Sequence, residues 1–521
     1  MVYTQKNPAL LLMSLLMLAI GFLFQEPSVT VQSVISYLDI DKQLGEIQTL
    51  PWYFGWFGLV AGLWQLVGRH KIGHLDYYLA TVPGAYLILT IAMLLVWFVD
   101  PWIAAVSKSF GPVMGDKYLH DVLGLNYVVL GILCGILIVN VFGIPRWAQH
   151  GVRLSRLGLK TGVILLGSLY SLGELESLGK LSVLLIAVFV LGSVGLVLLI
   201  ASRRNLPNSL TGVLSAGMGV CGVSATVACA PVVQAKSLEI AYTIGTVLLW
   251  GVGCMFIFPI IGNLLNMSPL QFGAWAGTGI LNSAQVAGAA LSYQPDGIET
   301  LKVAEIFNIT RVLFLPIIVL WLAVWFVKRE EGAQKIALGK VIVGKFPIFV
   351  LGFLLLFALS STGIFAPAKH YQGKYFDNAI PEEKLLSAEQ VTLLGAESAK
   401  VQKPQQIASL AALMQNRKLM SEDDDDTLRG LVNSKVLSAD ANVVLKAAHK
   451  AVRHTAKKVD MFRKIITWLF AFGLTGLGMQ ITIASIMQAG GEPLVIGGIV
   501  GTLKAVLSLI VVMLFVSGSV V

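Results

Sequence analysis

Long apolar runs separated by short polar segments dominate this chain. A helix needs about 20 mostly apolar residues to cross a bilayer, and the runs that reach or approach this length predict about thirteen transmembrane helices. The runs fall at residues 9–24, 51–67, 78–98, 126–142, 157–174, 181–201, 210–233, 240–262, 272–293, 311–327, 343–362, 465–487 and 494–517. This pattern predicts an all-α polytopic membrane protein. The first run lacks a small-residue cleavage site, so we interpret it as an uncleaved anchor.

Two of these runs, 210–233 and 272–293, are poorly suited to continuous helices. Their central parts read GVLSAGMGVCGVSATVACAP and GAWAGTGILNSAQVAGAA. Glycine costs a helix about 1 kcal/mol per position, and an unpaired backbone group in lipid costs several kcal/mol. We therefore expect both helices to be interrupted where protein or a wet cavity surrounds them. A pair of glycine-interrupted segments is the best sequence indication of a transporter's binding site.

One long segment, 366–460, departs from the membrane pattern because it is polar and amphipathic. Pro381 and Pro404 indicate helix starts, and Ser421 precedes an acidic run as an N-cap would. Ser438 is expected to cap a longer helix that continues through residue 464. Lys446, Lys450, Arg453 and Lys457 would then share one face, which is either an anion- or lipid-attracting surface or an ordinary solvated face. We predict a small helical soluble insertion.

These boundaries divide the chain into four parts. Residues 1–120 form an aromatic-rich N-terminal extension of three spans, expected to act as a scaffold or oligomer surface. Residues 121–365 contain the first part of a transporter core, 366–460 the insertion, and 461–521 the last two spans of the core. The segments 160–172 and 474–486 both place Thr-Gly before an apolar turn and run in opposite directions in the predicted topology, which favours inverted repeats.

Composition agrees with this interpretation. Hydrophobic residues make up 56% of the 521 residues and charged residues 13%, and the mean hydropathy is +0.77. The net charge of +9 follows from basic loops and needs no nucleic-acid partner. The four cysteines lie in apolar spans without metal-like spacing, so no metal site is expected.

Basic loops also predict the orientation, because Lys and Arg are retained on the cytoplasmic side. Clusters follow the second, fourth, sixth and tenth runs, near Arg69, Arg153, Arg203 and Lys328. One assignment places all four in the cytoplasm with the N-terminus, and places the insertion on the opposite side.

The first interrupted segment supplies one half of a candidate substrate site. A broken helix exposes a positive N-terminal dipole and unpaired carbonyls, which attract anions and cations respectively. Its candidate residues are Gly219, Cys221, Gly222, Ser224 and Thr226. The alternative is that these small residues serve close helix packing.

The second interrupted segment supplies the other half. Its centre is unusually polar, with neutral donors and acceptors able to bind an oxyanion. Its candidate residues are Gly279, Asn282, Ser283 and Gln285. Interhelical hydrogen bonding, which contributes about 0.6 kcal/mol on average, is the alternative.

Charged and amide residues near these segments are candidates for the transport pathway or for coupling. They are Lys236, Lys302, Asn308, Arg311 and Lys504. Lys302 and Glu305 are one helical turn apart and can pair. Arg311 opens a predicted span, where snorkelling to the interface is the alternative. Lys504 lies well inside the last span, where a lysine costs about 2.5–3.5 kcal/mol and needs a partner or water.

At these residues the chain resembles a known family. The runs GVLSAGMGVCGVSATVACAPVVQAK (212–236), FGAWAGTGILNSAQVAGAA (272–290) and ITRVLFLPIIVLWL (309–322) resemble the sulfate exporter family of bacterial inner-membrane proteins. The resemblance covers about 122–365 and 465–517, and leaves out the first 120 residues and the insertion. It implies a secondary transporter whose interrupted helices approach each other at mid-membrane.

Two departures from that family bear on coupling. Its members commonly carry an ionisable pair where this chain has Leu281 and Asn282, and a lysine near the position of Asn308. Neutral groups at these positions put proton coupling in question, and H+ or Na+ both stay open as coupling ions.

The prediction is therefore a multi-pass transporter of the bacterial inner membrane, not an enzyme, without a cofactor. Its cargo would be a small anion such as sulfate, a related sulfur oxyanion or an organic sulfonate, and the aromatic N-terminal spans favour a homo-oligomer. The alternative is a membrane sensor or assembly protein whose insertion binds a partner. No Ser-His pairing or acid-base cluster falls within the spans to suggest an intramembrane enzyme.

Overall fold

A computed structural model describes residues 8–67, 73–113, 118–123, 125–169, 172–294, 299–329, 348–365, 374–433, 436–487 and 491–516. Within these residues the chain is almost entirely helical. Five helices are long and apolar enough to cross a membrane, namely Ala80–Ser109, Leu181–Arg203, Ser237–Leu264, Glu299–Val327 and Gly491–Phe515. A sixth candidate consists of Ala9–Gln25 and Val29–Leu38, which meet at 96°. The protein is thus a multi-pass α-helical membrane protein.

The N-terminal helices form a layer of their own. They are α1 (Ala9–Gln25), α2 (Val29–Leu38), α3 (Leu44–Val67), α4 (Gly73–Leu94), a π-helical turn (Leu95–Val99) and α5 (Asp100–Ser109). Helices α1 and α3 run antiparallel and in close contact, because glycines of α3 face Leu18, Ser14 and Leu11 of α1. Short helices at Asp41–Gln43 and α6 (Leu119–Leu123) complete this part.

A second group of helices joins this layer to the main bundle. It contains α7 (Tyr127–Leu137, extended by a π-helical turn at Ile138–Phe142), α8 (Gln149–Leu166, followed by a 3-10 turn at Gly167–Leu169), α18 (Ile348–Ser361), α23 (Lys457–Gly478) and α24 (Ile483–Met487). Helices α8 and α23 pack antiparallel, since Ser155 faces Gly476 while Gly162 faces Phe470. The two segments that are similar in sequence, 160–172 and 474–486, therefore begin on helices that run in opposite directions.

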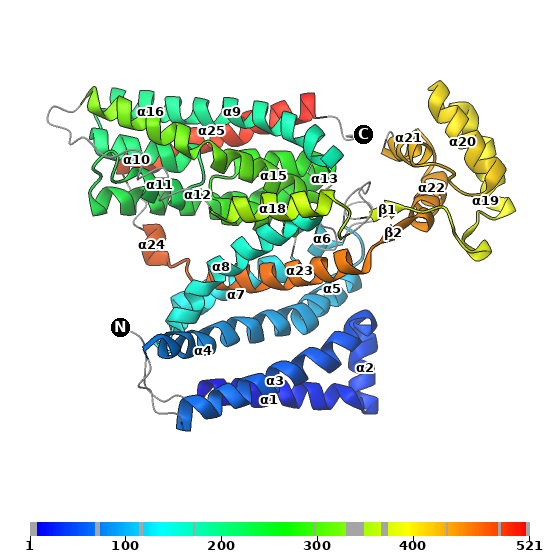
Figure 1. Ribbon diagram of the computed structural model, residues 1–521, viewed down its shortest axis with the longest axis horizontal. Coiled ribbons are helices and arrows are strands. Elements are labelled where there is room, and N and C mark those ends of the chain that lie inside the picture. The colour runs from blue at the N-terminus through cyan, green and yellow to red at the C-terminus, as the bar shows by residue number, and fades with distance from the viewer. Residues whose placement is uncertain are drawn as a thin grey trace.

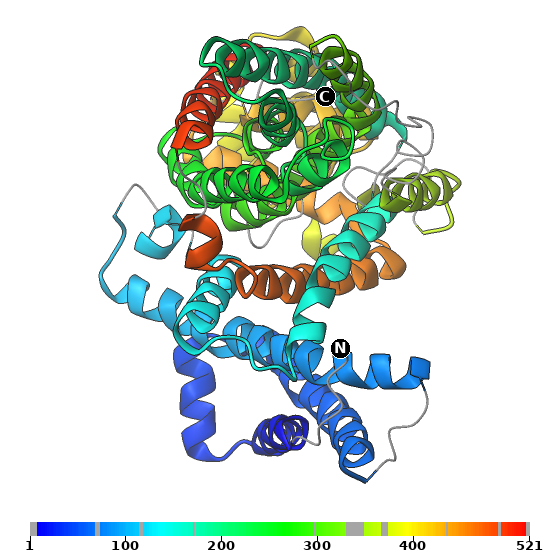
Figure 2. The same cartoon turned by 90° about the vertical axis from the view of Figure 1, so that its left-hand side faces the viewer.

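The main bundle contains the interrupted segments. Its members are α9 (Leu172–Arg203), α10 (Asn208–Gly219), α11 (Val223–Cys229), α12 (Ser237–Leu264), α13 (Pro269–Gly279), α14 (Ser283–Tyr293), α15 (Glu299–Leu313), α16 (Leu315–Val327) and α25 (Gly491–Phe515). Figure 2 looks along the helices of this bundle and shows the N-terminal helices, in blue, below it. The residues of α10 from Leu210 to Gly219 are all buried, so this bundle shields α10 from its surroundings.

One span begins earlier than the hydropathy pattern predicts. The tenth run was expected to start at Arg311, but the helical span extends from Glu299 to Val327. Residues 300–312 are all buried, and their polar side chains are paired inside the protein. Arg311 therefore lies in the middle of a span, and its predicted position at the opening of one is wrong.

Two of the basic clusters lie at the same end of the bundle. Arg329 donates to the Ser202 hydroxyl at 2.9 Å, and Arg204 contacts Glu492 at the start of α25. The insertion projects from the opposite end, at the right of Figure 1. This arrangement agrees with the predicted grouping of basic loops.

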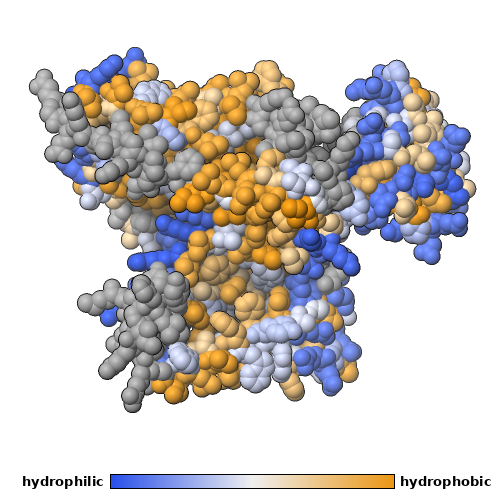
Figure 3. Space-filling view, viewed as in Figure 1, coloured by the Kyte–Doolittle hydropathy of each residue, from blue (hydrophilic) through white to orange (hydrophobic). Residues whose placement is uncertain are grey.

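The insertion folds around a hydrophobic core of its own. It contains a 3-10 turn (Glu382–Lys384), α19 (Ala388–Glu397), a second 3-10 turn (Ser398–Lys400), α20 (Pro404–Asn416), α21 (Glu422–Asn433) and α22 (Ala439–Val452). Strands β1 (Lys374–Phe376) and β2 (Arg453–Thr455) pair antiparallel at its base. The face of the molecule in Figure 3 is hydrophobic over much of the helical bundle and mainly hydrophilic over the insertion.

Three predicted helix starts in the insertion are confirmed, but the last predicted helix is not continuous. Pro404, Ser421 and Ser438 stand at the starts of α20, α21 and α22 as expected. The continuous helix predicted from Ser438 to residue 464 is wrong, because residues 453–455 form β2 and separate α22 from α23. The basic face predicted along that helix therefore does not form as proposed.

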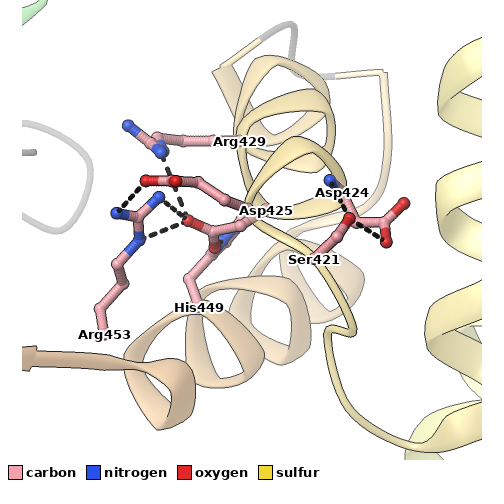
Figure 4. A network of polar contacts seen from close by, with 7 residues as sticks. Ser421, Asp424, Asp425, Arg429, His449 and Arg453 are labelled. Carbon is pink, nitrogen blue, oxygen red and sulfur yellow. Dashed lines mark hydrogen bonds and ion pairs between the residues drawn. The ribbon is translucent and has the colours of Figure 1, made fainter. Parts of the chain in front are cut away.

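A buried carboxylate explains why the chain leaves the helix there. Asp425 accepts hydrogen bonds from Arg453 and Arg429 and contacts the His449 ring, so it joins α21, α22 and β2 (Figure 4). Burial alone would raise the pKa of Asp425, but the bond to His449 and the charges of Arg453 and Arg429 outweigh it and leave this pKa below its usual value.

Candidate functional site

The first interruption separates α10 from α11 at residues 220–222. Gly222 has φ +76°, a conformation that residues with a Cβ rarely adopt. Helix α10 ends at Gly219, and α11 starts after Gly222. The structure thus confirms the interruption predicted from the glycine cluster, and Gly222 is the residue that the backbone geometry requires.

The second interruption separates α13 from α14 at residues 280–282. Ile280 and Asn282 have extended conformations, and the Asn282 side chain caps α14 by accepting from the Ala284 amide at 3.2 Å. Thr278 lies in the buried last part of α13, and its hydroxyl has no hydrogen-bond partner among the residues that the structure describes. The predicted interruption in 272–293 is also confirmed.

The two interruptions meet. A Cβ placed on Gly222 would lie 3.3 Å from both Cα and Cβ of Asn282. Each half-helix therefore directs one end toward the same small region in the interior of the bundle. The sequence predicted this pairing of residues near Cys221 with residues near Asn282.

A buried arginine lies at the second interruption. Arg311, on α15, is fully buried, and its guanidinium donates to the carbonyl of Ile280, which directly follows α13. It also donates to Asn308 Oδ1 at 2.9 Å, and Asn308 Nδ2 donates to Glu305 Oε2 at 3.0 Å. The Arg311 Nε has no hydrogen-bond partner in the described part of the chain.

A buried lysine lies at the first interruption. Lys504, on α25, is 3% exposed. Its Nζ donates to the carbonyls of Gly219 at 3.2 Å and Met218 at 3.4 Å, which are the last residues of α10. Each interrupted helix thus ends against a side-chain cation, which complements the negative end of its dipole.

Several polar atoms around the crossing have no partner among the described residues. They are Ser283 Oγ, Gln285 Oε1, Thr278 Oγ1 and Thr243 Oγ1. Gln285 is fully buried, and its Nε2 makes a long contact of 3.5 Å with the Leu248 carbonyl. Buried polar groups in proteins are normally hydrogen-bonded, so these atoms indicate a place that water or a ligand fills.

Comparison with known proteins places the chain in a family. The model of the family described as conserved hypothetical protein 698 matches residues 83–377. The chain belongs to this family. Its match begins inside the segment 1–120, which the sequence alone had placed outside the family pattern.

The relatives of this chain are named as membrane proteins. Two from Nitratidesulfovibrio vulgaris strain Hildenborough are each called UPF0324 membrane protein. One is 34% identical over 441 residues, covering 84% of this chain and 95% of the relative. The other is 39% identical over 303 residues, covering 57% of this chain and 79% of the relative.

A third relative is more distant. A UPF0324 membrane protein of Fusobacterium nucleatum subsp. nucleatum is 32% identical over 231 residues, covering 44% of this chain and 66% of the relative. No solved structure matches the chain. None of these printed names states a substrate.

The neutral residues Leu281, Asn282 and Asn308 have defined places in the structure. Leu281 is fully buried in a hydrophobic cluster with Val247 and Val500. Asn282 caps α14, and Asn308 bridges Glu305 and Arg311. An amide can hold an acid and a base together without a charge of its own, which is the role that Asn308 has here.

Not every candidate joins the crossing. Lys236 is exposed at the start of α12, where its backbone amide donates to Glu239. Lys302 donates to the Leu169 carbonyl at 2.9 Å, on the side of α8. Ser224 is exposed on α11, and the Thr226 hydroxyl turns back to the Gly222 carbonyl at 3.1 Å.

Packing accounts for part of the glycine pattern. A Cβ on Gly219 would lie 2.3 Å from Val194 of α9, and a Cβ on Gly279 would lie 3.0 Å from Phe258 and Ser508. These glycines allow neighbouring helices to approach, which was the alternative to a binding role, although the Gly219 carbonyl still faces Lys504. Thr243 and Gly251, on α12, were not identified from the sequence. The polar Thr243 inside an apolar run was the signal that could have indicated this position.

Proposed function

We propose that this protein is a secondary transporter that moves a small anion through the crossing of its two interrupted helices. One observation carries the proposal. Two basic side chains, Arg311 and Lys504, are buried where the interruptions meet. Among the described residues near the crossing, one buried carboxylate, Glu305, accompanies them. Ionisable residues at membrane depth are costly and mark substrate or ion pathways.

The neutral groups at the crossing suit an oxyanion. Asn282, Ser283 and Gln285 stand at the start of α14, whose amide groups carry the positive end of the helix dipole. The hydroxyl of Ser283 can donate to an anion, and the unpaired Nε of Arg311 is a further donor. We propose sulfate, a related sulfur oxyanion or an organic sulfonate as the cargo, and the bacterial inner membrane as the location.

We also propose about thirteen membrane segments arranged as inverted repeats. Besides the five full-length candidates, apolar helices at Tyr127–Phe142 and Ile348–Ser361 and the two interrupted pairs lie beside these spans. The antiparallel packing of α8 on α23 supports the inverted arrangement, because the two similar segments begin on these helices.

Transport of labelled sulfate and of a panel of other anions into vesicles that contain the purified protein tests the cargo. The Thr278→Val variant removes an unpaired hydroxyl at the crossing, and Thr90→Val removes an equally unpaired buried hydroxyl on α4. We expect transport to fall in the first variant and to persist in the second. Absence of any anion flux in either gradient direction would refute the proposal.

The insertion favours a second function, as a membrane sensor or assembly protein. It has its own core and joins the membrane helices through β1 and β2. Because Phe376 pairs with Arg453, an Asn-Gly hairpin turn can replace residues 377–452 without moving the strand ends. Unchanged transport in this variant would limit the insertion to regulation or partner binding, and loss of a partner without a transport defect would favour the sensor.

We further propose that the protein is a homo-oligomer that uses the aromatic face of α3. Tyr53, Trp56, Phe57 and Trp64 are all exposed on this helix. Crosslinking in native membranes tests the proposal, and a uniform population of monomers would contradict it.

A further inference from the structure

The carbonyl groups at the end of an interrupted helix form a cation site. The last carbonyls of a helix have no amide partner within it, and the helix dipole places about half a negative charge there. In transporters with interrupted helices, such carbonyls coordinate the coupling sodium ion. This protein has two ends of this kind, after α10 and after α13.

Both ends are already occupied by side-chain cations. The Nζ of Lys504 lies 3.2 Å from the Gly219 carbonyl and 3.4 Å from the Met218 carbonyl, at the end of α10. The guanidinium of Arg311 bonds the Ile280 carbonyl, at the end of α13. The two side chains come from different helices, α25 and α15, and both are almost completely buried.

From this arrangement we infer that Lys504 and Arg311 are built-in replacements for coupling cations, so that the protein binds no sodium ion at its crossing. The inference extends the proposed anion transport, and its consequence for the transport cycle rests on that proposed function. The occupancy of the two helix ends is independent of the cargo.

Electrostatics supports this inference. Lys504 and Arg311 already bring two basic side chains to the helix ends, and a sodium ion would add a further positive charge beside them in the low-dielectric interior. The nearby carboxylate of Glu305 is already engaged by the protein, because it accepts from Asn308 Nδ2 at 3.0 Å.

A fixed cation has a different consequence from a bound one. A sodium ion leaves with the cargo and couples transport to its gradient, whereas Lys504 and Arg311 stay with the protein. An anion that enters the crossing would meet the same two charges in every cycle. Its movement should therefore depend on its own gradient and on the membrane potential, and not on sodium.

Removal of Lys504 should create the missing sodium site. In Lys504→Ala, the Gly219 and Met218 carbonyls lose their donor, and the shortened side chain leaves space beside them. Lys504→Arg keeps the charge. Lys302→Ala is the matched control, because Lys302 is also a buried lysine that donates to a backbone carbonyl, but that carbonyl belongs to Leu169 rather than to an interrupted helix.

The test uses the purified full-length protein in detergent, with thermal unfolding measured in sodium chloride against choline chloride at constant ionic strength. Binding of labelled sodium to the same samples gives a second readout. A ligand that binds the folded state stabilises it by about 2.7 kcal/mol at 100 times its dissociation constant. We expect saturable sodium binding and a sodium-dependent rise in the unfolding temperature for Lys504→Ala only.

Each outcome decides the inference. Saturable sodium binding to the unaltered protein would overturn it, and so would a folded Lys504→Ala protein that does not respond to sodium. If Lys504→Ala does not fold, the unaltered protein and Lys504→Arg still test the inference. Neither should bind sodium, and sodium binding to either would overturn the inference. Failure of every anion to be transported would refute the proposed function and leave these binding results to decide the inference separately.

Discussion

Gly222 of the first interrupted helix lies directly against Asn282 of the second. A Cβ on Gly222 would be 3.3 Å from Asn282 Cβ and 2.8 Å from Val247 Cγ1, and the φ of Gly222 is +76°. The contact places the start of α11 and the start of α14 in one small region. It also makes Gly222 a residue with two independent constraints, one of conformation and one of space.

The Gly222→Ala substitution should therefore disrupt the crossing. A non-glycine residue held in such a conformation costs about 1–3 kcal/mol, and the contact with Val247 adds strain. We expect a lower thermal unfolding temperature in detergent and loss of anion transport in vesicles.

Gly192→Ala provides the control, because Gly192 lies in the interior of α9 and a Cβ there meets nothing within 4 Å. Alanine in a helix interior is favoured over glycine by about 0.5–1 kcal/mol. Equal unfolding temperatures for the two variants would contradict the constraint on Gly222.

Gly251 of α12 makes room for the buried amide of Gln285. A Cβ on Gly251 would lie 1.7 Å from Gln285 Oε1, so Gly251→Ala should displace this side chain from the crossing. Because Gln285 is a proposed ligand of the anion, we expect a raised KM for transport. Gly253→Ala, two residues along the same helix, meets nothing within 4 Å and should leave the KM unchanged. An unaltered KM in both variants would argue against a role for Gln285.

The sequence predicted the two interruptions, their pairing and the buried lysine, because glycine and polar residues inside apolar runs are local signals. It misplaced Arg311 at the opening of a span, because the charged and amide residues before it lower the hydropathy of residues 299–310. These polar side chains are tolerated at that depth because Glu305, Asn308 and Arg311 bond to one another and to Ile280. Such partners are set by tertiary contacts, which hydropathy does not record.

The hydrogen-bond partners of Lys504 could not be predicted from the sequence for the same reason. Its position deep in the last run predicted a partner, but the partner is the backbone of Gly219 and Met218, almost 300 residues away in the chain. Likewise, the sequence from Ser438 to residue 464 has a helical pattern throughout. It is interrupted because Arg453 bonds Asp425 and its strand pairs with β1.

Arg311 should not be replaceable by lysine. Its guanidinium donates to both the Ile280 carbonyl and Asn308, whereas a lysine has a single compact ammonium group that cannot span the same two partners. A lost hydrogen bond to a charged group costs about 1.5–3 kcal/mol, so Arg311→Lys should lower the transport rate by about tenfold or more.

The matched change is Arg329→Lys at the end of α16. Arg329 bonds the Ser202 hydroxyl and lies over the Trp325 ring, but both contacts are at the exposed end of the bundle. Vesicle uptake measured on both variants at equal protein content makes the comparison. A similar loss of transport in both variants would contradict a specific role for Arg311 at the crossing.

Asp425 should make the stability of the insertion depend on pH. Its pKa is lowered because the bond to His449 and the charges of Arg453 and Arg429 outweigh the effect of burial. A lowered carboxyl pKa stabilises the fold fully above the unfolded value, which is about 3.9. This contribution is lost as the pH falls from there through the lower folded value.

Asp425→Asn should therefore lower the free energy of unfolding of the insertion at neutral pH by about 3 kcal/mol, because it leaves the buried Arg453 without its counter-charge. Hydrogen exchange of the α21 and α22 amides in the full-length protein, corrected for the intrinsic pH dependence, measures the change. The variant should also lose less protection than the unaltered protein when the pH is lowered below about 4. Asp423→Asn alters an exposed carboxylate of the same acidic run and should leave both quantities unchanged. Equal protection in the two variants at neutral pH would mean that Asp425 does not hold α21, α22 and β2 together.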